Sequence, residues 1–176
     1  MNLKICKALF GLGSLLLILK LSGCGVYSFT GVAITAETLT IETFYNEAEG
    51  GPPDLAQTFT NKLRDYYLQN TNLTLVKNDG ELQLEGVVSG YKLSPVAPTA
   101  AGGNNVGLSD LTRLTITVSA TYTNTEDDTF NFENKRFSFY SDFDSNQNLT
   151  VIENRLIEEI YDQIILDIFN ASVANW

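Results

Sequence analysis

Within residues 111–123, the alternation between polar and apolar side chains that runs from Arg113 to Thr123 constrains the fold more than any other feature of the sequence. Successive side chains of a β-strand point to opposite faces of the sheet, so this period of two predicts a strand with one buried and one solvated face. The apolar side chains are Leu114, Ile116, Val118, Ala120 and Tyr122, and the polar ones are Arg113, Thr115, Thr117, Ser119, Thr121 and Thr123. The fold must therefore contain a sheet that other elements cover on one side only.

Two segments with apolar residues at helical spacing can supply that cover. Residues 55–70 and 151–172 are predicted to form amphipathic helices, the second about 33 Å long at 1.5 Å per residue. Their apolar stripes are Leu55, Phe59 and Leu63 in the first, and Ile152, Leu156, Ile160, Ile164 and Ile168 in the second. The spacing of a capping box precedes each stripe, formed by Asp54 with Gln57 and by Thr150 with Glu153.

Further strands are predicted on both sides of the first helix. They cover residues 38–45, 73–76 and 81–94, and the turn Asn78–Gly80 suggests that the second and third form a short–long hairpin. Residues 95–109 are rich in Pro, Ala, Gly and Asn and are predicted to form a loop.

The last predicted strand changes the parity of its aromatic residues. Phe130 and Phe132 lie at even positions, whereas Phe137, Phe139 and Phe143 lie at odd ones. One face cannot hold both sets in a regular strand, so a β-bulge is predicted within residues 133–136. The resulting fold class is α+β, with two helices packed on one face of a mostly antiparallel, about four-stranded sheet.

Composition excludes several classes of function. The chain has no His, which excludes imidazole catalysis and His-ligated metal sites. Its formal charge is −10, so binding to nucleic acid phosphates is disfavoured. The Asp and Glu residues lie in predicted turns and on a helix face, and Trp176 is the only Trp, so there is no Trp-rich sugar platform for a glycosidase. The sequence therefore predicts a protein that is not an enzyme and has no cofactor.

One acidic segment has the residue types of a calcium loop. Its ligand-like residues are Asp142, Asp144, Asn146, Asn148 and Glu153. Gln147 stands where the loop's turn glycine belongs, and a strand precedes the segment where a helix should. We interpret it as a strand-to-helix connection with no metal, and calcium binding remains the alternative.

The N-terminal residues have the pattern of a secretory signal. Lys4 and Lys7 precede an apolar run over residues 8–19, which is too short for the roughly 20 residues of a transmembrane helix. Leu21–Cys24 reads Leu-Ser-Gly-Cys and resembles the lipobox of bacterial lipoproteins. That resemblance implies a signal peptide over residues 1–23, a domain over residues 24–176, and an N-acylated diacylglycerol anchor, with palmitate among its acyl chains, on Cys24.

Removal of this leader changes the charge and removes a thiol. The leader holds Cys6, three of the 11 basic residues and none of the 21 acidic ones, so the formal charge becomes −13. Cys24 is then the only cysteine left and carries lipid, which excludes a disulfide. Gly25 follows it, whereas an Asp there would resemble the inner-membrane retention signal and an acidic cluster the surface-export signal of Bacteroidetes. The predicted location is the periplasmic side of the outer membrane.

Four segments resemble the Bacteroidetes form of the LptE family of lipopolysaccharide-assembly lipoproteins. They are residues 24–29 (CGVYSF), 63–67 (LRDYY), 113–118 (RLTITV) and 167–176 (DIFNASVANW). The resemblance implies a plug and assembly partner of the LptD-type β-barrel, which helps lipopolysaccharide reach the outer leaflet. It implies that barrel as partner, together with membrane lipid through the anchor and lipopolysaccharide as a possible ligand.

Basic residues are associated with lipopolysaccharide binding in this family, and three of them are candidates here. Arg113, Lys135 and Arg136 lie on strands that are predicted to be neighbours, so they are the candidate lipopolysaccharide or barrel contacts. The strongly acidic remainder argues against a broad phosphate-binding surface. The alternative function is a periplasmic or surface lipoprotein that binds cell-envelope glycan without a barrel partner.

Overall fold

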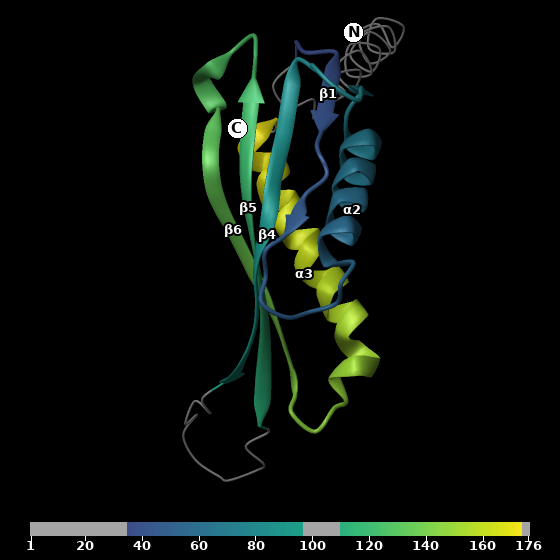
Figure 1. Cartoon of the computed structure of the whole chain (residues 1–176), viewed down its shortest axis with the longest axis vertical. Helices are drawn as coiled ribbons and strands as arrows, with labels where there is room; N and C mark the ends of the chain where they lie inside the picture. The colour runs from purple at the N-terminus through teal and green to yellow at the C-terminus, as the bar shows by residue number, and fades with distance from the viewer. Residues whose placement is uncertain (1–34, 97–109, 174–176) are drawn as a thin grey trace, which may run out of the picture. The chain divides into compact units, whose positions relative to one another are not determined.

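The computed structural model describes residues 35–96 and 110–173 (Figure 1). Its elements in chain order are β1 (Thr38–Ile41), β2 (Tyr45–Asn46), α2 (Leu55–Asn70), β3 (Thr74–Leu75), β4 (Leu82–Val96), β5 (Leu111–Asn124), the 3₁₀ turn η1 (Asp128–Phe130), β6 (Phe132–Asp144) and α3 (Leu149–Ser172). The predicted signal peptide, Cys24 and residues 97–109 of the predicted loop lie outside the described residues.

The six strands form one mixed sheet. Its order is β3-β1-β4-β5-β6, and β2 pairs with β4 as well. The three long strands β4, β5 and β6 are antiparallel, whereas β1 runs parallel to both β3 and β4 and β2 runs parallel to β4. The predicted α+β class and its two helices are confirmed, and the predicted sheet of about four mostly antiparallel strands differs in detail, because the sheet has six strands and its short strands pair in parallel.

The parallel strand β1 is the reason for this difference. It lies between β3 and β4, so those two strands do not form the predicted short–long hairpin. The strand predicted over residues 38–45 is also split, because Tyr45 belongs to the separate strand β2. Strands of two to four residues are too short for their side-chain pattern to reveal their direction. At the other end of β4 the ladder continues to Val96, two residues beyond the predicted boundary.

Both helices cover the same face of the sheet, as Figure 1 shows. That face carries the even-numbered side chains of β5, of which Leu114, Ile116 and Val118 are completely buried. The helices contribute the predicted stripes, with Phe59 and Leu63 from α2 buried in one apolar core with the isoleucines of α3. Each such side chain contributes about 1.5–3 kcal/mol when it leaves water. The opposite face of the sheet has no helix over it among the described residues.

Aromatic residues join the two helices. The Phe59 ring lies edge-to-face against Phe44 and Tyr161, with 5.0 Å between ring centroids in each case. The Tyr161 hydroxyl donates to the Leu55 carbonyl oxygen at 3.0 Å. Burial raises the pKa of Tyr161 above its ordinary value, so this hydroxyl remains a donor. Aromatic packing therefore holds the two helices together, and the buried Tyr161 hydroxyl still has a hydrogen-bond partner.

Neither predicted capping box forms. Asp54 is the N-cap residue of α2 but its side chain makes no capping hydrogen bond. The helix α3 begins two residues before the predicted start, and the side chain of Asn148 accepts from the Thr150 N–H at 3.0 Å. Asn is as good an N-cap residue as Thr, so it takes the position that the capping-box pattern assigns to Thr150. Glu153 accepts a hydrogen bond from Tyr91 of β4 instead.

The predicted bulge in β6 is confirmed. Glu133 and Asn134 together lie opposite Thr121 of β5, because the pairing shifts at this point. Asn134 has a positive φ of 49°, and its N–H donates to the Thr121 hydroxyl at 3.1 Å. The shift places Phe132 and Phe137 on the same face, with their ring centroids 5.7 Å apart.

Candidate binding surface

The uncovered side of the sheet is the candidate binding surface, and we call it the outward face. It consists of the odd-numbered residues of β5 from Arg113 to Thr123 and their neighbours on the two flanking strands, which include Lys92 and Ser94 of β4 and Arg136, Ser138, Tyr140 and Asp142 of β6. The β5 side chains of this face are all half-exposed, in contrast to the buried even-numbered residues between them. The alternation of the sequence thus produces a continuous polar surface.

Hydroxyl groups dominate the middle of the outward face. The Thr117 and Ser138 hydroxyls lie 3.0 Å apart, and those of Ser119 and Ser89 lie 3.2 Å apart. The Ser138 hydroxyl also donates to the Ile116 carbonyl oxygen at 3.1 Å, and the Ser89 hydroxyl to the Thr117 carbonyl oxygen at 3.4 Å. Each hydroxyl has two acceptor sites, so the capacity that remains for water or for a partner consists mainly of acceptor sites. This part of the surface can form many hydrogen bonds without carrying charge.

Arg113 is held in place at one end of the outward face. Its Nε and Nη2 donate to the two carboxylate oxygens of Asp142 at 2.7 and 2.8 Å, and its guanidinium lies 3.6 Å from the centre of the Tyr140 ring. The hydrogen bonds from Arg113 hold the pKa of Asp142 below its ordinary value. The negative charge of Asp142 compensates the positive charge of Arg113, so Arg113 alone binds a free anion weakly. The pair instead offers a partner a polar contact whose position is fixed.

The three candidate basic residues are not brought together. Their strands are neighbours as predicted, but Arg136 pairs with Ser119, six residues along β5 from Arg113, which is roughly 20 Å at about 3.3 Å per residue. Lys135 pairs with Ala120 and therefore lies on the helix-covered side, over the Phe132 and Phe137 rings. Only Arg113 and Arg136 share the outward face.

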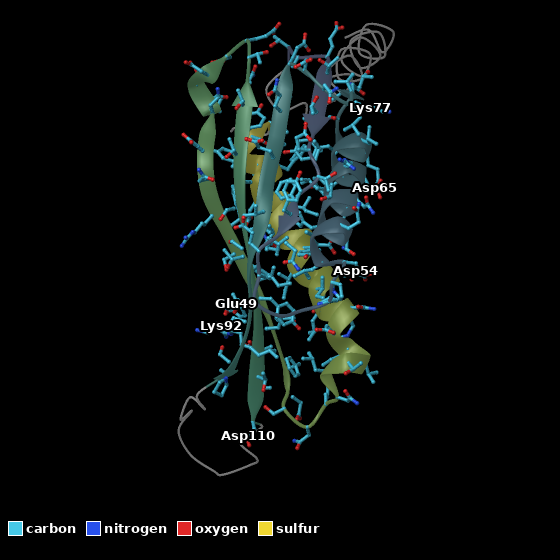
Figure 2. The ribbon with its side chains drawn as sticks, in the orientation of Figure 1. Glu49, Asp54, Asp65, Lys77, Lys92 and Asp110 are labelled. Carbon is cyan, nitrogen blue, oxygen red and sulfur yellow. The ribbon has the colours of Figure 1, made fainter. Side chains whose placement is uncertain are left out.

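Two residues that the sequence did not single out complete this end of the surface. Lys92 and Tyr140 lie on either side of Thr115, in the row next to Arg113 and Asp142. Figure 2 shows the labelled Lys92 side chain extending away from α2. The face of the sheet on which these two side chains lie depends on the register shift in β4 and on the bulge in β6. The local sequence around each residue therefore could not predict that they lie beside Arg113.

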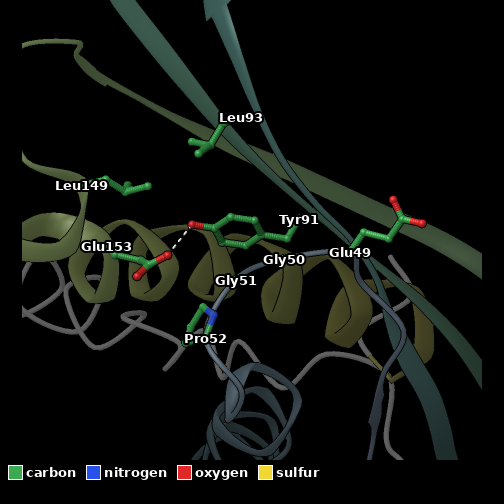
Figure 3. Close-up of a pocket in the computed structure, with 8 residues that line it drawn as sticks. All are labelled: Glu49, Gly50, Gly51, Pro52, Tyr91, Leu93, Leu149 and Glu153. Atoms are coloured by element: carbon green, nitrogen blue, oxygen red, sulfur yellow. Dashed lines mark hydrogen bonds between the residues drawn. The ribbon is translucent and has the colours of Figure 1, made fainter.

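A cavity of about 500 Å³ opens on the helix-covered side, next to the start of α3 (Figure 3). Its lining residues are Glu49, Gly50, Gly51, Pro52, Tyr91, Leu93, Leu149 and Glu153. The Tyr91 hydroxyl donates to the Glu153 carboxylate at 2.5 Å. The pKa of Tyr91 is raised above its ordinary value, mainly by burial and further by this hydrogen bond. This bond joins β4 to α3 across the cavity.

The residues of the calcium-like segment have other partners. Asp142 binds Arg113, Asn148 caps α3, and Glu153 accepts from Tyr91. Within residues 35–96 and 110–173 no three His, Cys, Asp or Glu side chains are grouped so that they could hold a metal ion. In the same ranges no helix combines the length and the apolar character needed to cross a membrane.

The Arg113–Asp142 pair predicts a specific pH dependence. A carboxyl whose pKa is lowered by folding stabilises the fold above its unfolded pKa, and this contribution is lost as the pH falls through the folded pKa. We expect Arg113→Ala to move the titration midpoint of Asp142 upward, toward the ordinary value of about 3.9. Carboxyl-carbon NMR measures this midpoint. Arg155→Ala, which breaks an exposed ion pair on α3, is the control that leaves Asp142 unchanged, and an unchanged midpoint in Arg113→Ala contradicts the assignment.

One family of known proteins matches most of the chain. The sequence model of the LptE family, described as lipopolysaccharide-assembly, matches residues 36–172. These residues include both helices and all six strands of the part of the chain that the structure describes. No curated protein sequence matches the chain.

Solved structures with a similar fold have little sequence in common with the chain. A hypothetical protein from Chlamydia trachomatis superposes with a TM-score of 0.51 at 10% identity, over 80% of this chain and 99% of that one. Uncharacterized lipoprotein B from Nitrosomonas europaea has a TM-score of 0.49 at 12% identity, over 76% and 79% of the two chains. A minor lipoprotein from Acinetobacter baumannii has 0.43 at 14%, over 76% and 89%. The likeness concerns the fold alone, and only the first match supports it.

Proposed function

The chain belongs to the LptE family of lipopolysaccharide assembly, and from this premise we propose that it is an outer-membrane lipoprotein that acts as plug and assembly partner of an LptD-type β-barrel. Its role is then to support lipopolysaccharide transport to the outer leaflet, without enzymatic activity. In this proposal the signal peptide of residues 1–23 is removed and the diacylglycerol and acyl groups on Cys24 hold the domain on the periplasmic side of the membrane. Two or three acyl chains provide stable anchoring, whereas one is marginal.

The outward face is the observation that carries the proposal. Interiors of outer-membrane barrels are polar, so a plug needs a surface that can exchange water for the hydrogen bonds of such a wall. The hydroxyl groups around Thr117 and Ser138 offer this capacity, while the apolar residues of the same strands are buried under α2 and α3. This face is polar, no helix of the described residues covers it, and the helices α2 and α3 pack against the opposite side of the same sheet. These properties support contact with a barrel wall.

The charges of the chain favour a protein contact over direct capture of an anionic glycolipid. With a formal charge of −13 after loss of the leader, the domain repels phosphate groups over most of its surface. Arg113 and Arg136 remain the candidate contacts for lipopolysaccharide or the barrel on the outward face, with Lys92 beside the first of them. Lys135 lies on the other side of β6, so it contacts the barrel in this proposal only if the barrel also surrounds that edge.

Site-specific photocrosslinking in intact cells tests the proposal. We expect a photoreactive amino acid at Thr117, in the middle of the outward face, to crosslink to a β-barrel protein identified by mass spectrometry. The matched control position is Asp65, which is exposed on α2 and labelled in Figure 2. Equal yields from the two positions contradict the assigned face. A chain that crosslinks to no barrel and is retained by cell-envelope polysaccharide favours the glycan-binding alternative.

A further inference from the structure

The cavity beside the start of α3 lies on the side of the sheet that the proposed barrel contact does not use. Tyr91 pairs with Ile116, whose side chain is buried under the helices, so the cavity and the outward face are on opposite sides of β4. We call it the Tyr91–Glu153 cavity, after the hydrogen-bonded pair that spans it. Its volume of about 500 Å³ falls within the range of about 300–1,000 Å³ that is usual for ligand sites. A ligand bound there is an interaction beyond the proposed function.

Most side chains that line the cavity are apolar. Figure 3 shows Leu93 and Leu149 on one side of the Tyr91 ring and Pro52 on the other. Leu93 is 42% exposed, so it offers apolar surface to a partner. The Gly51 backbone packs so closely on the Tyr91 ring that a Cβ there would lie 2.8 Å from Cδ2. This contact and the hydrogen bond of the hydroxyl hold the ring in place, so the cavity is formed before a ligand binds.

The Glu153 carboxylate at one end of the cavity carries a charge that no cation of the described residues balances. Within those residues it accepts one hydrogen bond, from the Tyr91 hydroxyl, and forms no ion pair. The other ionisable side chain of the lining with a formal charge is Glu49, which has the same sign. Glu153 is half-buried beside apolar walls, where a charge loses hydration unless an opposite charge compensates it. The cavity is therefore complementary to a cation.

The chain does not supply this cation itself. It has 11 Lys and Arg residues, and none of those in the described part lines the cavity. Residues 24–34, 97–109 and 174–176 contain neither Lys nor Arg. The remaining basic residues are Lys4, Lys7 and Lys20, which belong to the leader that the proposed function removes. A cation that binds in this cavity therefore comes from another molecule.

A second tyrosine–carboxylate pair in the chain shows which cation such a pair can hold. Arg113 donates to both carboxylate oxygens of Asp142 and lies over the Tyr140 ring. Tyr91 and Glu153 present the same two groups without a guanidinium. A carboxylate has about four lone-pair sites and Tyr91 uses one of them, so Glu153 can still accept two N–H groups. A guanidinium suits a half-buried site better than an ammonium, because it is more weakly hydrated and donates in pairs.

We propose that the Tyr91–Glu153 cavity binds an arginine side chain that a partner protein presents next to an apolar residue. The guanidinium donates to the Glu153 carboxylate, and the aliphatic part of the arginine contacts the apolar walls. Arginine commonly buries its methylene groups in this way while its charged end keeps polar partners. The neighbouring apolar residue of the partner contacts Leu93 and Leu149. Charge and shape together give this contact its specificity.

Two capped peptides test the arginine in the parent chain. We expect acetyl-Leu-Arg-amide to bind the full-length chain in detergent with a dissociation constant roughly tenfold to hundredfold lower than that of acetyl-Leu-citrulline-amide. Citrulline has nearly the shape of arginine and no charge. NMR chemical shifts of Tyr91 and Glu153 measure the binding. Equal affinities for the two peptides overturn the proposal, as does a chain that binds neither of them.

Removal of one carboxylate tests the position of the site. Glu153→Gln keeps the size of the side chain and an acceptor for the Tyr91 hydroxyl, but it removes the charge. We expect this variant to bind acetyl-Leu-Arg-amide roughly tenfold more weakly or worse. The matched control is Glu158→Gln at an exposed position of the same helix, which should bind like the parent. Equal affinities of the two variants overturn the assigned cavity, and the peptide comparison in the parent does not depend on how either variant folds.

Calcium is the competing occupant, because Glu153 also belongs to the calcium-like segment. We expect the affinity for acetyl-Leu-Arg-amide to be the same in buffers with calcium and with chelator. Within the described residues no group of three acidic side chains could hold a metal ion, which supports this expectation. Displacement of the peptide by calcium overturns the assignment of a guanidinium.

Photocrosslinking from Leu93 in intact cells extends the test to the partner protein. We expect the crosslinked segment of the partner to contain an arginine, and the yield to fall both when that arginine is replaced by glutamine and in Glu153→Gln. A yield that persists in both variants overturns the inference. Crosslinking from Thr117 is measured in the same cells as the separate test of the proposed function. Loss of one product with retention of the other therefore shows which of the two proposals is wrong.

Discussion

Replacement of Gly86 by alanine is expected to lower the free energy of unfolding by about 3 kcal/mol, the upper end of what overpacking a core costs. A Cβ at this position would collide with the carbonyl oxygen of Ser119, and it would lie 2.6 Å from Phe44 Cε1 and 3.0 Å from the Ala120 Cα. Two of these three atoms belong to the backbone of β5, which cannot rotate away as a side chain can. Denaturation by urea measures the loss as a lower midpoint.

Gly90 in the same strand provides the matched control. The nearest atom to a Cβ built there is Thr117 Cβ at 3.4 Å, and its φ lies outside the left-handed region. Gly90→Ala should therefore stay within about 1 kcal/mol of the parent chain, because a glycine replaced without strain restricts the unfolded chain. Equal losses at the two positions would show that alanine acts through general strand propensity and not through the close approach of β4 to β5.

The sequence predicts those parts of the fold whose cause is local. The alternation in β5 and the apolar stripe of α3 each repeat over a dozen or more residues, so their period identifies the element and its buried face. The bulge in β6 follows from the same reasoning, because the parity of Phe132 and Phe137 is inconsistent with a regular strand. These features needed no information about which strands are neighbours.

The parallel strand β1 depends on contacts between residues about 40 positions apart. The Glu81 carboxylate accepts the backbone N–H groups of Glu37 and Thr38, and these hydrogen bonds lower the pKa of Glu81. The hydroxyl of Thr40 accepts the Gly80 N–H at 2.9 Å. A Glu and a Thr beside short strands have no distinctive spacing, so the placement of β1 between β3 and β4 could not be predicted.

The sequence predicts that a polar surface exists, but it does not predict how the charged side chains on that surface are arranged relative to one another. That one face of β5 remains polar follows from its alternation, and this face became the outward face. The distance between Arg113 and Arg136 depends on strand register, which the sequence does not reveal. Register also explains why Asp142, part of a calcium-like pattern, is the partner of Arg113 from 29 residues away.

Replacement of Phe59 by alanine is expected to have the largest effect on stability, a loss of about 3–5 kcal/mol. Its ring is completely buried and lies edge-to-face against Phe44, which precedes β2, and Tyr161 of α3. The cavity left by alanine would border all three segments, and the Tyr161 hydroxyl, fixed to the Leu55 carbonyl, limits how far its ring can shift to fill it. The same denaturation experiment measures the loss.

Leu68→Ala is the control for Phe59→Ala, because Leu68 lies on the same helix and is 49% exposed. Truncation there should change the free energy of unfolding by about 0.5 kcal/mol or less, as is usual for surface positions. If the two variants lose similar stability, the helix layer is not anchored at Phe59 and the rigid support assumed for the outward face is wrong. If only Phe59→Ala is strongly destabilised, photocrosslinking from Thr117 should weaken in that variant, because a plug whose helices detach no longer holds the sheet in the form that its partner binds.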